Sequence, residues 1–251
     1  MATQLGPKIH TDNLIFCADP ANPESFNVST NALTDIVGGK SMTLGAHTTD
    51  VTTHGVRHFA STQGETGSGT LDTGIRYGSI TNGDKVVGGD TSFTIMFWVY
   101  RTTGIPNNWW HTITDGHSGD ILTIQNATNG NFVISMNNST HGGTGASGTY
   151  SGVNWASCKE NSWNMIGVRY NINDAKIEAF VGNPDSGVSF SSKITTSPIN
   201  TSYKIRNFNG YGTAQSSYHA DNSFSYVIVY DEYLNNSYIT QNFNQLKPRF
   251  T

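Results

Sequence analysis

Apolar residues along the chain fall in short runs that are separated by turns of Gly, Asn, Ser and Asp. The clearest run covers residues 93–100. Successive side chains of a strand point to opposite faces of the sheet. Both faces of this run are largely apolar, with Phe93, Ile95, Phe97 and Val99 on one and Thr94, Met96, Trp98 and Tyr100 on the other. The pattern predicts a central strand that is covered on both sides.

Further runs of strand type follow one another along the chain. We expect strands at residues 14–18, 110–114, 121–125, 131–136, 163–170, 176–181, 203–208 and 224–230. The polar residues 171–174 have the length of a hairpin turn. One short C-terminal helix is expected, where residues 234–237 supply a cap and Tyr238, Ile239, Asn242 and Phe243 follow at helical spacing. Many strands with one late helix predict an all-β, two-sheet antiparallel sandwich.

Composition agrees with β structure. Charged residues make up 13% of the chain, against about 25% in an average soluble domain, whereas 27 residues are Gly. One large β-sandwich can use all 251 residues. We therefore expect a single domain over residues 1–251, with residues 1–12 as an N-terminal arm.

Charge and hydropathy limit the classes of partner. The net charge is −4 and the 14 Lys and Arg residues are scattered, so we expect no nucleic-acid partner. No apolar run approaches the roughly 20 residues of a membrane span, so we expect no membrane partner. Residues 1–8 lack the apolar core of a secretion signal, which predicts synthesis in a cytoplasm.

The chain has two cysteines, Cys17 and Cys158, and the sequence does not determine whether they pair. Cys17 belongs to the apolar residues 14–17, where a thiol packs as a small apolar side chain. This position favours a buried free thiol over a disulfide.

Several motifs occur in a recognisable order. Residues 14–26 give an apolar strand followed by Asp-Pro-Ala-Asn-Pro-Glu-Ser-Phe, and a short Asp-Ile-Val-Gly-Gly turn follows at residues 35–39. Later segments of the same series are residues 93–99, 161–168, 177–183 and 224–244. Together they resemble the LamG-like, concanavalin A-like jelly rolls found in bacteriophage structural proteins and bacterial surface proteins. The resemblance runs from about residue 14 to residue 250 and implies a jelly-roll sandwich, although residues 38–93 depart from the family pattern.

Hydrolysis of a polysaccharide needs paired carboxylates. Glucanases of the resembled fold carry them as Glu-x-Asp-x-x-Glu on one strand, and this pattern is absent. The glutamates Glu24, Glu65, Glu160, Glu178 and Glu232 are isolated from one another. No Gly-x-Ser-x-Gly motif occurs, although eight His and many Ser leave a spatial triad open. We therefore expect no enzymatic activity.

The resemblance also implies that Ca²⁺ is the metal to consider, because LamG domains often hold it with Asp carboxylates and backbone carbonyls. Two polar loops contain such oxygen donors, and their candidate ligands are Asp115, Asp120 and Asp221. Asp, Gly and Asn are also ordinary turn residues, and that interpretation is the stronger one. We expect no cofactor, and a structural Ca²⁺ is the alternative.

Sugar recognition combines an aromatic face with neighbouring amides. Asn107, Asn108 and Trp109 supply both beside Pro106. Adjacent strand residues face opposite ways, so Trp110 is expected to open the next strand and Trp109 to stay exposed. Second candidates are Tyr211 and Tyr218 in the loop 210–222, whereas Trp98, Trp155 and Trp163 are expected in the core.

These observations favour a non-enzymatic virion structural protein of a bacteriophage, either a head decoration protein or a fibre or tail accessory. Its partners would be other virion proteins and copies of itself in a homo-oligomer. The alternative is a receptor-recognition module that binds a host-surface glycan through Trp109 and the nearby amides. A polysaccharide hydrolase is the function that the residues favour least.

Overall fold

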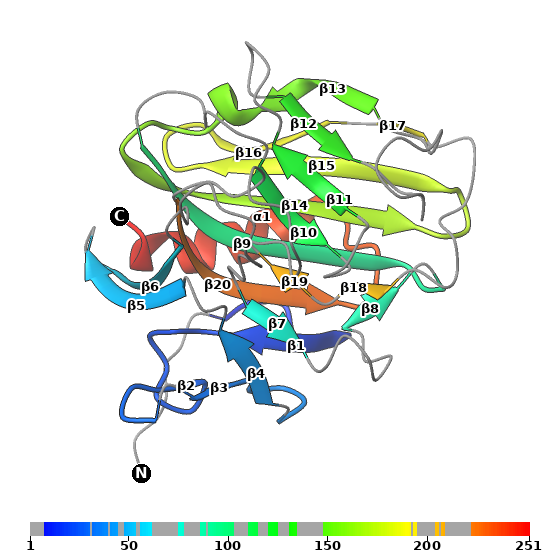
Figure 1. Ribbon diagram of the computed structural model, residues 1–251. Helices are drawn as coiled ribbons and strands as arrows, with labels where there is room; N and C mark the ends of the chain where they lie inside the picture. Colours follow the sequence, from blue (N-terminus) through cyan, green and yellow to red (C-terminus); the bar gives the residue numbers. More distant parts are fainter. Residues whose placement is uncertain are drawn as a thin grey trace, which may run out of the picture.

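A computed structural model describes residues 8–30, 32–39, 41–44, 48–53, 56–61, 75–77, 86–88, 90–102, 110–114, 120–124, 131–134, 148–191, 193–194, 204–205, 207–208 and 222–251. All strand pairs within these residues are antiparallel. The strands form two large sheets that lie face to face (Figure 1). The predicted all-β, two-sheet antiparallel jelly-roll sandwich is therefore confirmed.

The first sheet has the strand order β16-β15-β14-β9-β20-β6-β5. Its strands are β16 (Gly187–Phe190), β15 (Lys176–Asn183), β14 (Ser162–Asn171), β9 (Phe93–Arg101), β20 (Asn222–Tyr230), β6 (Val56–Ser61) and β5 (Thr48–Thr53). Two further strands extend it, since β1 (Leu14–Ala18) pairs with β20 and β17 (Lys193–Ile194) pairs with β15. The hairpin predicted at residues 171–174 joins β14 to β15, as expected.

The second sheet has the strand order β13-β12-β11-β10-β19-β7-β4-β3-β2. Its strands are β13 (Gly148–Asn154), β12 (Asn131–Ile134), β11 (Asp120–Ile124), β10 (Trp110–Thr114), β19 (Asn207–Phe208), β7 (Ile75–Tyr77), β4 (Ser41–Leu44), β3 (Ala32–Thr34) and β2 (Phe26–Asn27). A separate pair consists of β8 (Val87–Gly88) and β18 (Lys204–Ile205). The predicted single strand at residues 203–208 is thus two strands, β18 and β19. Ile205 and Phe208 are both buried in one core although residues three apart on a flat strand face opposite ways, so one continuous strand could not bury both.

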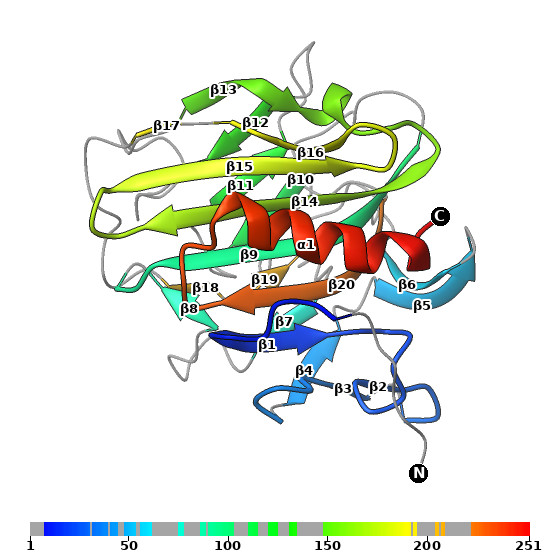
Figure 2. The same cartoon turned by 180° about the vertical axis from the view of Figure 1, so that it is seen from behind.

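Strand β9 is covered on both sides, as its pattern predicts. Phe93, Ile95, Phe97 and Val99 belong to the core between the sheets. Met96 and Trp98 face the other way, into a second core under the helix α1 (Asn236–Leu246). Figure 2 shows α1 lying across the outer face of the first sheet, over β9, β14 and β20. The scaffold therefore has three layers at this point.

The predicted C-terminal helix is confirmed and begins at its expected cap. The side chain of Asn235 accepts a hydrogen bond from the backbone N–H of Tyr238. The helix buries Ile239, Phe243 and Leu246 against the sheet. A 3-10 turn, η3 (Lys247–Arg249), follows, and the Phe250 ring stacks on Trp98 at a centroid distance of 4.3 Å. Among the described residues, no helix is both long and apolar enough to cross a membrane.

Both cysteines are buried free thiols, as predicted for Cys17. Burial raises the pKa of Cys158 from 9.0 to about 12. Burial and the nearby Asp19 carboxylate do the same for Cys17, also to about 12. Neither thiol is ionised near neutral pH.

Candidate functional site

The sugar-binding residues proposed from the sequence lie outside the described part of the chain: Asn107, Asn108, Trp109, Tyr211 and Tyr218. Two of the candidate Ca²⁺ ligands, Asp115 and Asp221, lie outside it as well. Asp120 is the first residue of β11 and pairs with Thr114 of β10, but its side chain is not described. Their proposed roles stay predictions. Within the described residues, no group of three His, Cys, Asp or Glu side chains is placed to hold a metal ion.

The tryptophans expected in the core are found there. Trp98, Trp155 and Trp163 are 1%, 3% and 2% exposed. Their indole faces contact protein and cannot serve as stacking platforms for a sugar. A binding surface in the described part of the chain must therefore use other residues.

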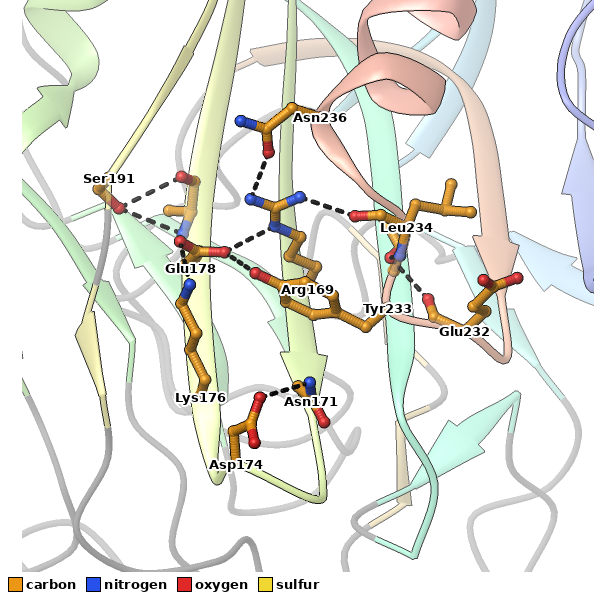
Figure 3. Close-up of polar contacts among 12 residues, drawn as sticks. Arg169, Asn171, Asp174, Lys176, Glu178, Ser191, Glu232, Tyr233, Leu234 and Asn236 are labelled. Atoms are coloured by element: carbon orange, nitrogen blue, oxygen red, sulfur yellow. Dashed lines mark hydrogen bonds and ion pairs between the residues drawn. The ribbon is translucent and has the colours of Figure 1, made fainter.

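Glu178, which the sequence shows isolated from the other glutamates, has two cationic partners and a hydroxyl partner in the fold. Its carboxylate accepts a hydrogen bond from Nε of Arg169 at 2.8 Å, forms an ion pair with Nζ of Lys176 at 3.2 Å, and also accepts from the Tyr233 hydroxyl. Figure 3 shows these groups meeting between β14, β15 and the segment that leads into α1. Arg169 also donates to the carbonyl of Leu234 at 2.7 Å and to Asn236 Oδ1 at 2.6 Å. Neighbouring strands bring together residues that the sequence keeps apart.

This cluster is built to hold the fold rather than to react. A tyrosine that donates to a glutamate could serve as a nucleophile only if its hydroxyl were activated. Burial and the hydrogen bond to Glu178 instead raise the pKa of Tyr233. The side chains of Arg169 and Glu178 are each only 5% exposed. The ion pair therefore docks the segment before α1 onto the first sheet.

Glu160 also has a cationic partner. Arg101 donates to the Glu160 carboxylate at 2.7 Å and to the carbonyl oxygens of Trp155 and Cys158. Arg101 is buried, with 7% of its side chain exposed. This arginine fixes the connection between β13 and β14.

A cavity of about 290 Å³ lies where the chain leaves β1. It is lined by residues between Pro20 and Ser29 and by Arg57 of β6. Pro23 and Val28 present apolar surface, and Val28 is 54% exposed. The Arg57 guanidinium lies over the Phe26 ring, 5.6 Å from its centroid. The cavity thus combines apolar walls with the arginine side chain and an amide at Asn27.

The wall of the cavity is held in place by local hydrogen bonds. The Asp19 side chain accepts from the backbone N–H of Ala21, and the Asn22 side chain accepts from that of Glu24, both at 3.0 Å. Asp19 is also bound by both terminal nitrogens of Arg249, at 2.8 and 3.0 Å. Bidentate pairs of this kind fix orientation as well as distance. The chain end is therefore tied to the segment that forms the cavity.

The floor of the cavity is joined to the core by aromatic contacts. Phe26 meets Phe59 edge-on with ring centroids 5.3 Å apart, and Phe59 packs against Phe224 at 5.6 Å. These rings link β2, β6 and β20. The segment 20–29 is thereby anchored on a rigid scaffold, as a preformed binding site requires.

Sequence reasoning missed this cavity. In the sequence, Pro20 and Pro23 are noted only as part of the motif at residues 14–26. A signal was nevertheless present, because Val28 is an apolar residue inside a polar turn between Asn27 and Ser29. The contribution of Arg57 could not be foreseen, since residues 38–93 offered no strand register.

No family model and no curated protein sequence matches the chain. Solved structures of similar fold include Trypanosoma rangeli sialidase in complex with 2,3-difluorosialic acid, with 10% identity and a TM-score of 0.57. That alignment covers 98% of this chain and 35% of the sialidase. The same enzyme in complex with sialic acid gives 11% identity and a TM-score of 0.54, over 94% of this chain and 33% of the sialidase. A receptor binding domain matches at 14% identity with a TM-score of 0.54, over 94% of this chain and 51% of that one.

The chain shares a β-sandwich fold with these proteins. It spans about a third of the length of the sialidase structures, and the identities are low, so the likeness shows the fold alone. The expectation of a non-enzymatic protein is contradicted, because the similar structures are sialidases and one sialidase mutant with trans-sialidase activity. That expectation rested largely on the absence of a glucanase motif from a single strand. The absence of this motif does not exclude other glycan chemistry.

Proposed function

We propose that the chain is a glycan-binding module and that the cavity formed by residues 20–29 and Arg57 holds the sugar. The observation that carries the proposal is the cavity itself. It has a preformed wall, hydrogen-bond donors and apolar surface in one place. Its volume of about 290 Å³ is at the lower end of small-molecule sites, which run from about 300 to 1,000 Å³. A single sugar unit at the end of a glycan suits a site of this size.

The chemistry of the lining agrees with sugar recognition. A pyranose ring presents hydroxyl groups at its rim and C–H groups on its faces. Pro23 and Val28 supply apolar contact for a ring face, and Asn27 supplies amide groups for hydroxyls. The similar fold of a sialidase crystallised with sialic acid supports a glycan as ligand in preference to other small molecules.

The role in a phage particle stays a prediction without support from the comparisons. The sialidases and the receptor binding domain are described by their activity or binding, and none is described as a virion protein. Self-association and contacts with virion proteins are likewise untested. The glycan-binding hypothesis, which the sequence placed second, is therefore the better supported one.

A glycan array, followed by calorimetry on each glycan that is retained, tests the proposal. Ala21 is exposed and lines the cavity, so Ala21→Trp should fill it and abolish binding without affecting the fold. Ala156 is also exposed but lies in η2 (Trp155–Ser157), and Ala156→Trp is the matched control that should bind normally. Retained glycans are also checked for cleavage by mass spectrometry.

Trp109→Ala separates the two proposed locations. Loss of binding in Ala21→Trp alone would place the site at the cavity. Loss in Trp109→Ala alone would keep the glycan-binding function and move the site to residues 107–109. Failure of the unmodified chain to retain any glycan would contradict the proposed function.

A further inference from the structure

Resting on the proposed function, we infer that the bound sugar carries an acetamido group, with its methyl against Pro23 and Val28 and its carbonyl oxygen on Asn27. An acetamido group holds a hydrogen-bond acceptor and an apolar methyl side by side. The cavity offers the complement, because the primary amide of Asn27 lies in its wall beside apolar side chains. A hydroxyl group brings no methyl, and a carboxylate has no apolar end.

The backbone of the cavity wall has few hydrogen-bond donors to spare for a ligand. From residue 20 to residue 26, two residues are prolines, which have no N–H group. The N–H of every other residue in this segment donates to an oxygen of Asp19 or Asn22. A ligand against this part of the wall must therefore find its donors on side chains.

Asn27 is a neutral side chain that supplies such donors. Its Oδ1 accepts from the backbone N–H groups of Ser29 and Thr30, at 3.0 and 3.3 Å. These two bonds fix which end of the amide is oxygen and hold its plane in the loop. Nδ2 carries two hydrogens and has no hydrogen-bond partner among the described residues. The amide is thus fixed in place with its donors available to a carbonyl oxygen.

Pro23 and Val28 supply the apolar half of the contact. Both line the cavity, and Val28 is 54% exposed, so a ligand can cover it. Burial of one methyl group against such a surface strengthens binding about fourfold. Neither half of the contact uses the Arg57 guanidinium, which lies over the Phe26 ring and has a further interaction within the protein.

Calorimetric titration with two matched pairs of glycans tests the inference. Chitobiose and cellobiose are neutral and share one linkage, and acetamido groups in the first replace hydroxyls in the second. The acidic pair is 3′-sialyllactose, built on N-acetylneuraminic acid, and its counterpart built on 2-keto-3-deoxy-nononic acid, where a hydroxyl replaces the acetamido group. In each pair we expect the acetamido glycan to bind about tenfold more tightly, from one hydrogen bond and one buried methyl.

Asn27→Asp removes the donors and keeps the loop. The aspartate retains an oxygen that can accept from Ser29 and Thr30, and it places an acceptor where Nδ2 was. The affinity for chitobiose should fall to that for cellobiose, by about tenfold. Asn235→Asp is the matched control, because it makes the same exchange at the cap of α1, where Oδ1 accepts from the Tyr238 N–H. This control should bind both disaccharides as the unmodified chain does.

Val28→Thr tests the apolar half and provides a second variant in case Asn27→Asp does not fold. It replaces one methyl group by a hydroxyl at a position that is 54% exposed, so the fold should persist. The affinity for chitobiose should fall about threefold, with cellobiose unaffected. Val37→Thr makes the same exchange at an exposed valine that does not line the cavity, and it should bind normally.

The outcomes separate this inference from the proposed function. Equal affinity within both pairs would overturn the acetamido inference and leave glycan binding intact. Binding of none of the four glycans, while the array retains another, would do the same. So would an unchanged preference for chitobiose in Asn27→Asp, or in Val28→Thr if Asn27→Asp does not fold. No binding of any glycan would overturn both. A preference for the acetamido glycan that is lost in either variant, with the controls unchanged, supports the inference.

Discussion

Arg169 and Arg57 each lie over an aromatic ring, and their surroundings differ. Arg169 lies over Tyr233, 4.5 Å from the ring centroid, and all of its nitrogens donate to protein acceptors. Arg57 lies over Phe26 at the wall of a cavity and is half-buried. The same kind of side chain beside an aromatic ring is enclosed in one region and lies at the wall of a cavity in the other. The difference separates a buried region that holds the scaffold from the half-buried region of the proposed glycan site.

The enclosed region should be the more sensitive to substitution. Arg169→Met leaves Glu178 in a buried position without its main counter-charge. The free energy of unfolding should fall by about 3–5 kcal/mol, as measured by urea denaturation. The double variant Arg169→Met/Glu178→Leu should recover part of that loss, because no buried charge is then left unpaired. A loss below about 1 kcal/mol, the usual worth of an exposed ion pair, would contradict the structural role.

Glycine substitutions compare a tightly packed position in the first sheet with an open turn position by the same change. A Cβ at Gly167 of β14 would lie 2.3 Å from the Ile95 carbonyl oxygen and 2.3 Å from the Phe180 ring. Gly167→Ala should therefore cost about 3 kcal/mol, the upper range for overpacking. Gly39 has φ of +69° and no atom within 4 Å of a Cβ, so Gly39→Ala should cost only the strain of that backbone, about 1–2 kcal/mol. Equal losses in the two variants would contradict the difference in packing.

Arg249→Ala links the two regions, because this residue of the C-terminal turn holds Asp19 at the start of the cavity wall. Removing it leaves the Asp19 carboxylate buried without its bidentate partner. Stability should fall by about 1.5–3 kcal/mol. Hydrogen exchange of residues 20–26 should accelerate more than that of β14, and glycan affinity should fall. Uniform acceleration over both segments would show that Arg249 acts on the whole fold instead.

Ionisation of either of the two buried thiols should change the stability least among these predictions. The size of the change reports how well the scaffold excludes water. Each keeps its proton in the folded state up to a pKa of about 12, whereas the ordinary value is 9.0. Above about pH 9 the unfolded chain loses protons that the folded chain retains, so stability should fall as the pH rises. The loss should be about 1.4 kcal/mol for each thiol at pH 10.

Denaturation at pH 7 and pH 10 measures this loss, and Cys158→Ala should reduce the difference between the two. A thiol reagent at pH 8 should label neither cysteine before unfolding and both after it. Rapid labelling of the folded chain would contradict the enclosed core.

The sequence was sufficient for the layers of the scaffold but not for the contacts between distant strands. The alternation over residues 93–100 predicted a strand covered on both faces, because apolar burial repeats with the pleat. The Arg169–Glu178 pair was missed because it depends on β14 and β15 lying side by side in one register. The bulge at Tyr226, where φ is +49° and β20 changes its partner from β6 to β1, leaves no pattern in the apolar positions.

The candidate site was harder to predict for the same reason. The cavity wall comes from one short segment of the chain, and its residues Pro20, Pro23 and Val28 could have indicated it. Its charged group comes from β6, within the residues whose strand pairs the sequence did not place. Trp109 was chosen because an aromatic beside amides is a visible local signal, whereas a cavity is a property of the folded chain.

Titration of the isotope-labelled chain with 3′-sialyllactose, followed by nuclear magnetic resonance, tests the central claim most directly. The account predicts saturable shifts of the backbone amides among residues 20–29 and at Arg57, with β14 and β15 unaffected. Shifts confined to residues 107–109 or 211–218, or no shifts for any acidic or neutral glycan, would contradict the assignment of the cavity as the binding site.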